Sequence, residues 1–515
     1  MTDLCGLPDE LLLAVAKCLR DYTRNGYSDL THLALSCRKL RPIAQEVFYT
    51  EVCTNPRQRQ GLARLARTLL QRHDLASRVR KLSIELSGKP IMHLESCVSS
   101  REYHRYDRCT CGIPELGTHF IAFASTVESG NDITLHNVGW EDMLMRGVDT
   151  ALVKLILCIT PALSDLTLEN RGSQLYANYK NVVWGEFGEL FHDVARHKEF
   201  AECFQGLSSL TRLTTNGYPP CNWLSLPRLE AASINLFEDA FYCDDYLNSD
   251  EMMWYIAPSG TVSTSLTRLI IQADFEAFHS HEATHGQGVY GHMRSVVRGL
   301  TNLTHLFILY RTIIDPYGRF NPHNTPRGSF AHIVAHLESR SLTNLTLDVE
   351  PALKDLVRYM IMLEYTRDVS PMTRLAGLPK LRNLNAPQEA FFSANEEFRT
   401  CHLPATIESI GIMDSRYETK RYLKHLLDHQ TKWPNLKNIK LGESPCNDRS
   451  VYPDEHNDGD ASESDEGERQ KDFDIDDSIY EQARSRGFQV EKVQDTTAWK
   501  KGWEGLHEQG MWKRR

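Results

Sequence analysis

Long apolar runs are missing from this 515-residue sequence, and their absence argues against several classes of protein. The longest apolar stretches, Leu11–Ala16 and Leu155–Ile159, are far too short to cross a bilayer. The first ten residues, MTDLCGLPDE, lack a basic region followed by an apolar one, so we expect no secretory signal. The sequence therefore predicts a protein of the cytoplasm, the nucleus or both, with no membrane partner.

Catalytic signatures are also scarce. We find no G-x-x-x-x-G-K-[ST], no G-x-G-x-x-G after a strand and no G-x-S-x-G elbow. No broad basic face is evident, and the net charge is -10, which argues against nucleic acid as a partner. We therefore expect a protein that is not an enzyme and that uses no cofactor.

The chain has 13 cysteines, an odd number spread over its whole length. Without an export signal, this usage favours reduced thiols over a disulfide framework. A C-x-C pair at Cys109 and Cys111 lies near Cys97, His93 and His104, which leaves a zinc site conceivable. Structural zinc sites usually combine two C-x(2–4)-C pairs, and no second pair follows, so ordinary loop cysteines are the favoured interpretation.

The negative charge is concentrated in one stretch. Residues 454–477 contain twelve acids and two bases, and twelve minus two accounts for the whole net charge of -10. Such a stretch buries too little apolar surface to stay ordered, so we predict an acidic disordered segment over 446–478. A flexible loop, a docking tail for a basic partner and phosphorylation at Ser462 are alternative roles.

Residues 1–52 are predicted to form a compact three-helix module. Pro8 suits the first turn of a helix, and apolar residues then recur at helical spacing. Ser28 is a candidate cap for a second helix, and Pro42 marks the start of a third segment. Three short helices make a small core, so we expect this module to pack against the next part of the chain.

From about residue 60 an apolar-x-x-apolar-x-apolar pattern recurs. Clear copies are VRKLSI at 79–84, Leu163/Leu166/Leu168, Leu266/Leu269/Ile271, Leu303/Leu306/Ile308, Leu342/Leu345/Leu347, Ile407/Ile410/Ile412 and Leu436/Ile439/Leu441, and weaker copies are Leu210/Leu213, Leu229/Ile234 and Leu381/Leu384. Five middle positions, Ala232, Leu269, Leu306, Leu345 and Leu384, are separated by 37, 37, 39 and 39 residues. We predict one strand for each copy.

Helical patterns alternate with these strands. They lie at Val148–Ile159, Val289–Leu300, Phe330–Leu337, Leu353–Leu363 and Tyr422–Leu427. Helix alternating with strand at a near-fixed period is typical of a solenoid, and the repeat core resembles the leucine-rich repeat. We predict an α/β fold with an irregular leucine-rich-repeat-like αβ solenoid over 53–445. The alternative is an ordinary α/β domain with buried Leu-rich strands.

The C-terminal residues, 479–515, are predicted to form a final αβ unit or cap. Ile479–Arg486 has a helical pattern, Gly487 should end that helix, and Phe488–Val493 alternates like a strand. Three tryptophans follow in a polar context, and nothing in the sequence decides whether they pack.

One stretch matches a zinc-protease motif. His281-Glu282-Ala283-Thr284-His285 reads H-E-x-x-H, which on a helix places two imidazoles on one face with a glutamate as general base. The surrounding Gly-rich sequence is a poor basis for a rigid helix, and it lies between two predicted strands, where insertions form loops. A zinc metallopeptidase stays a remote alternative, and we predict no metal or catalytic residues here.

The N-terminal module resembles the F-box over residues 7–52. The first half matches as Leu7-Pro8-x-Glu10-Leu11-Leu12, with Leu19 following. The second half matches as Asp29-Leu30-x-x-Leu33-Ala34-Leu35-Ser36-Cys37-Arg38-x-Leu40, and Ala44, Val47, Phe48, Tyr49 and Val52 complete it. The connection DYTRNGYS between the halves is longer than is typical of the family. With its repeat region, the chain is similar to the F-box proteins with leucine-rich repeats that are numerous in filamentous fungi.

The resemblance implies a substrate-recognition adaptor subunit of a Skp–cullin–F-box ubiquitin ligase. The F-box would bind the Skp adaptor of the cullin ligase core, and the repeats would bind an unknown protein substrate destined for degradation. By carry-over, the residues in or next to the adaptor-binding surface are Leu7, Pro8, Leu11, Leu12, Leu33, Leu35, Ser36, Cys37 and Leu40. The main alternative is a repeat scaffold that works without a ligase.

Overall fold

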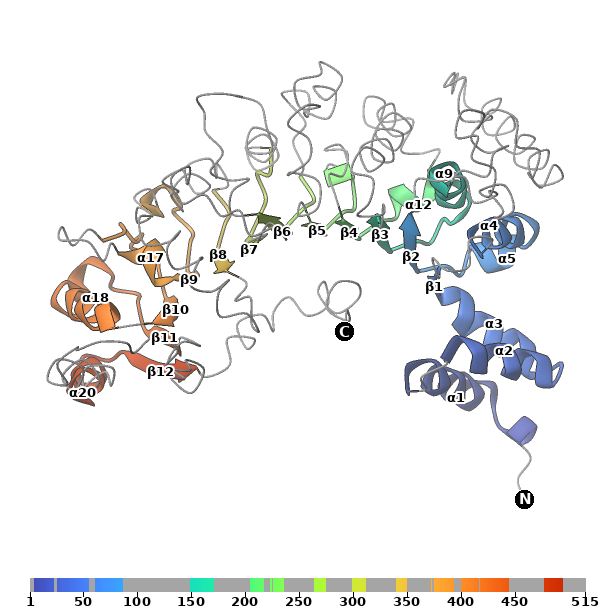
Figure 1. Cartoon of the computed structure of the whole chain (residues 1–515), viewed down its shortest axis with the longest axis horizontal. Helices are drawn as coiled ribbons and strands as arrows, with labels where there is room; N and C mark the ends of the chain where they lie inside the picture. The colour runs from blue at the N-terminus through green and yellow to red at the C-terminus, as the bar shows by residue number, and fades with distance from the viewer. Residues whose placement is uncertain are drawn as a thin grey trace, which may run out of the picture. The chain divides into compact units, whose positions relative to one another are not determined.

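The computed structural model has an α/β fold (Figure 1). It describes residues 4–22, 26–54, 61–86, 149–170, 204–216, 223–224, 226–235, 264–274, 299–311, 340–349, 372, 375–392, 400–415, 417–443 and 477–493. The acidic segment, the H-E-x-x-H motif, the C-x-C pair and the three C-terminal tryptophans lie outside these residues.

Ten α-helices and three short 3-10 helices lie in the described part of the chain. The α-helices are α1 (Asp9–Tyr22), α2 (Gly26–Ser36), α3 (Leu40–Thr50), α4 (Gly61–Gln71), α5 (His73–Ala76), α9 (Asp149–Ile159), α12 (Gln205–Ser208), α17 (Gln388–Phe391), α18 (Tyr417–Asp428) and α20 (Asp477–Ser485). Short 3-10 helices are η1 (Leu4–Gly6), η6 (Leu375–Gly377) and η7 (Gln430–Lys432). None of the helices in the described part of the chain is long and apolar enough to cross a membrane.

Twelve described strands form one sheet whose order follows the sequence. They are β1 (Glu51–Cys53), β2 (Lys81–Leu86), β3 (Asp165–Asn170), β4 (Arg212–Asn216), β5 (Ala231–Asn235), β6 (Arg268–Asp274), β7 (His305–Arg311), β8 (Asn344–Val349), β9 (Asn383–Pro387), β10 (Ser409–Ser415), β11 (Asn438–Glu443) and β12 (Gln489–Val493). Every predicted copy of the apolar pattern corresponds to one of the strands β2 to β11, so those strand predictions are confirmed.

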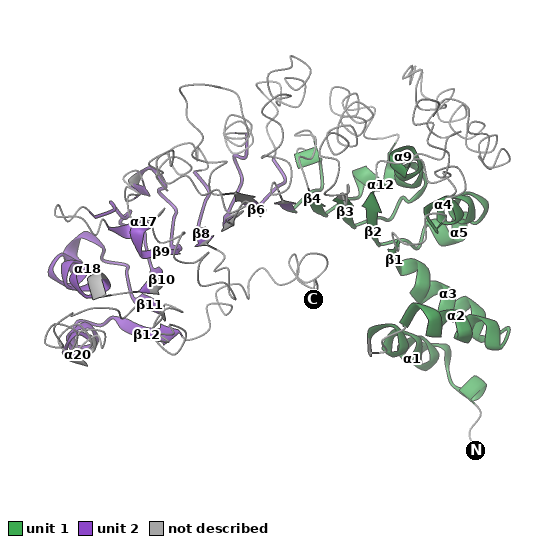
Figure 2. Ribbon diagram, in the orientation of Figure 1, with its two compact units in different colours: residues 1–232 green, residues 233–515 purple. Residues whose placement is uncertain are grey.

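The chain divides into two compact units, residues 1–232 and 233–515 (Figure 2). This division falls within the region 53–445 that the sequence assigned to one solenoid. The first unit contains β1 to β4 and the described helices α1 to α5, α9 and α12, and the second contains β6 to β12 and the described helices α17, α18 and α20.

The strands pair in parallel and in register at the middle position of the apolar pattern. In the first unit Val52 pairs with Leu82, which pairs with Leu166, and Leu166 pairs with Leu213. In the second unit the same ladder runs through Leu269, Leu306, Leu345, Leu384, Ile410, Ile439 and Val490. All of these residues except Val490 are buried. A parallel sheet buries side chains best when each strand presents its apolar residue at the same level.

A ladder of hydroxyl groups runs beside part of the apolar ladder, with a threonine one residue before β4, β7 and β8. Thr211 Oγ1 donates to the Ser164 carbonyl at 2.9 Å in the first unit. Thr304 Oγ1 donates to the Thr267 carbonyl at 2.9 Å, and Thr343 Oγ1 to the Thr304 carbonyl at 3.0 Å, in the second. Each of these carbonyls also accepts the backbone N–H groups of the threonine and of the residue after it, so the hydroxyl adds a third donor at the turn.

Helices of the first unit pack against one another in sequence order. Helix α4 contacts α9, and α9 contacts α12. All eleven residues of α9 are buried, including Lys154, whose ammonium lies 5.8 Å from the centre of the Phe204 ring. The predicted helices at Val148–Ile159 and Tyr422–Leu427 are confirmed as α9 and α18. The other three predicted helices fall outside the described residues, apart from Gly299 and Leu300 at the end of Val289–Leu300, which are not helical.

The N-terminal helices α1, α2 and α3 share a small core. Its buried members are Leu12, Ala16, Leu30, Leu40, Ile43 and Val47. The prediction that Ser28 caps the second helix is wrong, because α2 already begins at Gly26. A Cβ at Gly26 would lie 2.3 Å from the Arg20 carbonyl oxygen, so only glycine permits this close approach of α2 to the end of α1.

The last described elements, α20 and β12, match the predicted final αβ unit. Gly487 has a φ of +84°, and its N–H donates to the Arg484 carbonyl at 2.9 Å. The Phe488 N–H donates to the Ala483 carbonyl at 3.0 Å, which completes a Schellman motif. Glycine ends the helix here because a left-handed residue costs it nothing, as the sequence predicted.

Candidate functional site

Burial sorts the nine candidate adaptor-binding residues into three groups. Leu12 and Leu40 belong to the core of the module, with 1 % and 4 % of their surface exposed. Leu7, Leu33 and Cys37 are half-buried and pack against that core. The exposed candidates, which are free to contact another molecule, are Pro8, Leu11, Leu35 and Ser36.

Helix α1 is apolar on two faces. Its inner face carries Leu12 and Ala16, which are buried against α2 and α3. The outer face repeats the same spacing one residue earlier, as Leu11, Val15 and Cys18, and all three are exposed. Residues at i, i+4 and i+7 lie on one side of a helix, so α1 offers a continuous apolar stripe away from the core.

This outer stripe lines a shallow depression of about 470 Å³. Its lining is almost entirely apolar and consists of Leu7, Leu11, Ala14, Val15, Cys18 and Leu19. Leu11 is 52 % exposed within it, and Leu35 on α2 is 70 % exposed outside it. The exposed large apolar side chains among the described residues are Leu4, Leu11, Val15, Tyr27 and Leu35, all in the first 35 residues. Leu11 and Val15 line the same depression, so these two side chains form a local apolar patch at the surface.

The segment before α1 is held in place by Lys39. The Lys39 ammonium donates to the carbonyls of Cys5 at 2.7 Å and Leu7 at 3.1 Å. It also lies 3.8 Å from the Asp9 carboxylate, in the first turn of α1. One side chain from the α2–α3 turn thus fixes the start of α1 and, with it, the position of Leu7 at the edge of the depression.

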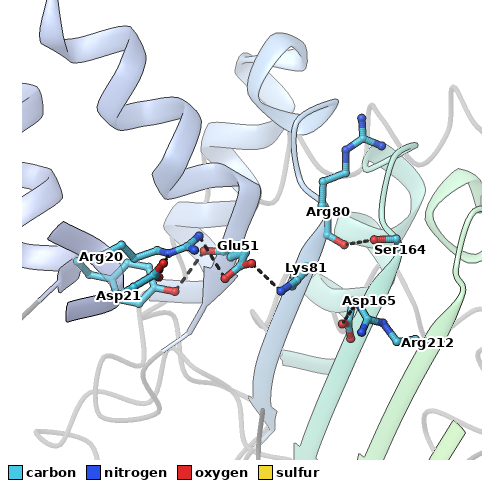
Figure 3. Close-up of polar contacts among 9 residues, drawn as sticks. Arg20, Asp21, Glu51, Arg80, Lys81, Ser164, Asp165 and Arg212 are labelled. Atoms are coloured by element: carbon cyan, nitrogen blue, oxygen red, sulfur yellow. Dashed lines mark hydrogen bonds and ion pairs between the residues drawn. The ribbon is translucent and has the colours of Figure 1, made fainter. Parts of the chain in front are cut away.

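Glu51 connects the helical module to the sheet of the first unit (Figure 3). One of its carboxylate oxygens lies 3.2 Å from the Arg20 guanidinium of α1, and the other lies 2.6 Å from the Lys81 ammonium of β2. The Tyr27 hydroxyl donates to the Glu51 carbonyl at 3.2 Å. Burial of the Tyr27 phenol, with nearby Cys53 adding to it, raises the pKa of Tyr27 to about 12, so this donor stays protonated at neutral pH.

A second ion pair follows along the same row of the sheet. Asp165 on β3 lies 3.2 Å from Arg212 on β4, and Lys81 is its register partner on β2 (Figure 3). Burial raises the pKa of the Asp165 carboxyl, and the charges of Arg212 and Lys81 oppose that rise. Opposite charges therefore pair between neighbouring strands along the row Glu51, Lys81, Asp165 and Arg212. Because two acids face two bases, the row has little net charge to attract a ligand.

The depression on α1 is lined almost without reactive side chains. Among the residues that line it, the Cys18 thiol is the one potential nucleophile, and none is an acid or a base. Within the described part of the chain, no group of three or more His, Cys, Asp or Glu side chains is placed to hold a metal ion. The predicted alternatives that depend on His281, Glu282 and His285 lie outside that part of the chain.

Sequence reasoning identified part of this surface and overlooked the rest. Leu11 and Leu7 were assigned from the resemblance, whereas Ala14, Val15 and Cys18 were not assigned a contact role. The signal was present as two interleaved i, i+4, i+7 stripes, Leu11/Val15/Cys18 and Leu12/Ala16/Leu19. Only one stripe can face a three-helix core, so the other had to be exposed or covered by something else. A search of the chain against protein-family models and against curated proteins finds no match.

Proposed function

We propose that this protein is a substrate-recognition subunit of a Skp–cullin–F-box ubiquitin ligase. In this proposal the outer stripe of α1 and the exposed part of α2 bind the Skp adaptor. The parallel-sheet region binds a target protein and brings it close to the ubiquitin-transfer subunits. Catalysis is then a matter of proximity, and the chemistry belongs to other subunits.

One observation carries the proposal: α1 has a second apolar stripe that its own module leaves exposed. Leu11, Val15 and Cys18 are spaced to fit a hydrophobic groove of a partner, which is how amphipathic helices commonly bind. Burying one leucine side chain contributes roughly 1.5–3 kcal/mol, so two or three such anchors support a specific complex. The F-box resemblance of residues 7–52 names the partner.

The sheet supports the second half of the proposal. Consecutive strands pair in parallel with their neighbours in sequence, the apolar ladder repeats from strand to strand within each unit, and threonine hydroxyls support the turns before β7 and β8. Units that each bury a face against the next one are what an irregular leucine-rich-repeat solenoid requires. Such arrays present extended surfaces for a protein partner.

The test is binding of the full chain to the purified Skp adaptor, measured by calorimetry. We expect wild-type protein to bind, and we expect Leu11→Asp to weaken binding by at least ~30-fold, equivalent to about 2 kcal/mol, since a carboxylate would be buried in an apolar contact. Lys17→Asp is the matched control, because Lys17 is exposed on α1 and is not among the residues that line the depression.

The outcomes separate the two leading functions. Loss of binding in Leu11→Asp but not in Lys17→Asp supports the ligase subunit. If folded wild-type protein does not bind the adaptor at all, the N-terminal helices serve another partner and the chain is a ligase-independent scaffold.

A further inference from the structure

Two thiols that are far apart in sequence lie in contact in the N-terminal module. Cys5 Sγ in η1 lies 3.7 Å from Cys37 Sγ, which follows α2, although 32 residues separate them. Both cysteines are half-buried, both pack against the module's core, and neither is in a disulfide. Sulfur atoms in van der Waals contact need to approach by only about 1.7 Å to reach the bond length of a disulfide, ~2.05 Å.

We propose that Cys5 and Cys37 form a reversible disulfide that fastens η1 to the turn between α2 and α3. The oxidant is a low-molecular-weight disulfide of the glutathione type. One protein thiolate attacks it, forms a mixed disulfide and releases one glutathione thiol. The second protein thiolate then attacks the protein sulfur of the mixed disulfide and releases the second glutathione thiol. Two protein thiols are oxidised, one glutathione disulfide is reduced, and two glutathione thiols carry away the two protons.

Cys37 is the better placed of the two to attack first. The backbone N–H of Leu40, the first residue of α3, points at Cys37 Sγ with a nitrogen–sulfur distance of 3.4 Å. A thiolate at the N-terminus of a helix is stabilised by such an N–H group and by the helix dipole. Cys5 then resolves the mixed disulfide, because its sulfur is already in contact with that of Cys37.

The covalent link would act on the same segment that Lys39 holds by hydrogen bonds. Lys39 donates to the carbonyls of Cys5 and Leu7, so the reduced form already keeps η1 near the turn. A disulfide replaces this attachment by a covalent bond that lasts until it is reduced. The same bond restricts the loop of residues 6–36 in the unfolded chain. Oxidation should therefore stiffen the start of α1 without moving its inner face.

The test uses the full chain, equilibrated in oxidised and reduced glutathione, quenched with N-ethylmaleimide and digested with trypsin. Cleavage at Lys17, Arg24 and Arg38 separates Cys5, in residues 1–17, from Cys37, in residues 25–38. We expect mass spectrometry to find these two peptides joined in the oxidised sample, as the main form of the Cys5 peptide, and separate after dithiothreitol. Joined peptides that are only a trace, or a Cys5 peptide carrying mainly glutathione or another cysteine partner, would overturn the proposal.

Two variants fix the assignment. Cys5→Ser should abolish the joined peptides, and Cys18→Ser, which removes the exposed thiol of α1, should leave them at the wild-type level. Loss of the link in Cys18→Ser would point to that thiol as the real partner. The wild-type measurement stands alone if a variant folds poorly.

Hydrogen exchange supplies a readout of the mechanical effect. Amide exchange over residues 4–12 should slow in the oxidised wild type and should not respond to oxidation in Cys5→Ser. An oxidised protein with the link formed but with unchanged exchange would show that the bond does not tether η1. None of these measurements involves the Skp adaptor, so they hold or fail independently of the proposed function.

Discussion

Helix α1 and strand β7 are each apolar on two sides, yet the structure treats their second sides in opposite ways. On β7, Leu306 and Ile308 face one side and Phe307 and Leu309 the other, and all four are fully buried. On α1, Leu12 and Ala16 are buried, whereas Leu11 on the other side is 52 % exposed. A second apolar face is therefore part of the core in the sheet and part of the surface in the helix.

The difference separates apolar side chains that stabilise the fold, as on β7, from apolar side chains that stay at the surface, as on α1. Parallel strands covered on both faces read as continuous apolar runs, and HLFILYR of β7 does so. Strand β2, with the sequence KLSIEL, instead alternates half-buried and buried residues. In our proposal, the exposed stripe on α1 is the part of the apolar surface that a partner covers.

The largest effect is expected when an apolar side chain is removed from the second buried face of β7. Phe307→Ala should lower the free energy of local unfolding around β7 by about 3–5 kcal/mol, because it leaves a cavity in a fully packed site. Ser83→Ala on β2, at the same level of its strand, should change local stability by no more than ~0.5 kcal/mol. Hydrogen exchange of peptides that span each strand measures both. An equal, small loss at both positions would mean that the second face of β7 contributes no more than an open face.

The two faces of α1 provide the next test. Leu12→Ala should destabilise the helical module by about 2–4 kcal/mol, since Leu12 is 1 % exposed in the core. Leu11→Ala, one residue earlier, should cost at most ~0.5 kcal/mol while reducing adaptor binding. Exchange of the α1 amides and adaptor affinity are measured on both variants. A large stability loss in Leu11→Ala would show that the outer stripe is part of the core after all.

The smallest effect concerns the hydroxyl ladder, which is shared by both units. Thr343→Val and Thr211→Val each remove a hydroxyl that donates to a turn carbonyl, and Thr211→Val should cost about 1 kcal/mol of local stability. Thr343 Oγ1 also accepts from the Asn344 side-chain amide at 2.8 Å, so Thr343→Val removes two hydrogen bonds and should cost more. The change conserves shape, so each loss reports the hydrogen bonds that the hydroxyl makes. Losses in the exchange of both β4 and β8 indicate that the hydroxyl contributes in both units, and no loss at one of the two sites would contradict this.

Much of the strand pattern could be predicted because it depends on local rules. The recurring apolar pattern placed β2 to β11, and Gly487 correctly ended α20. Strand β1 was overlooked because it has only three residues, and because Val52, at its centre, had been assigned to the end of the N-terminal module. The start of α2 was misplaced because Ser28 is a good capping residue, whereas the close approach of Gly26 to Arg20 is a tertiary contact that no local signal reveals.

The sequence predicted that the N-terminal helices carry a binding surface, but it did not predict which of their residues are exposed on it. Nine residues came from the resemblance, and burial divides them into core and surface. Leu11 and Leu12 are adjacent leucines with the same local propensity. Only the positions of α2 and α3 leave Leu12 1 % exposed and Leu11 52 % exposed. The contact between Cys5 and Cys37 was likewise invisible, since 32 residues separate the two thiols and no spacing rule joins them.

The sequence by itself determined where the strands recur, where helix α20 ends, and that α1 has two apolar stripes. These features depend on periodicity and turn chemistry, which act within a few residues. The tertiary structure decided which stripe of α1 is covered, which face of each strand is sealed and which thiols meet. Those outcomes depend on the packing of segments distant in sequence, where the area removed from water and the close fit of neighbouring atoms set the free energy.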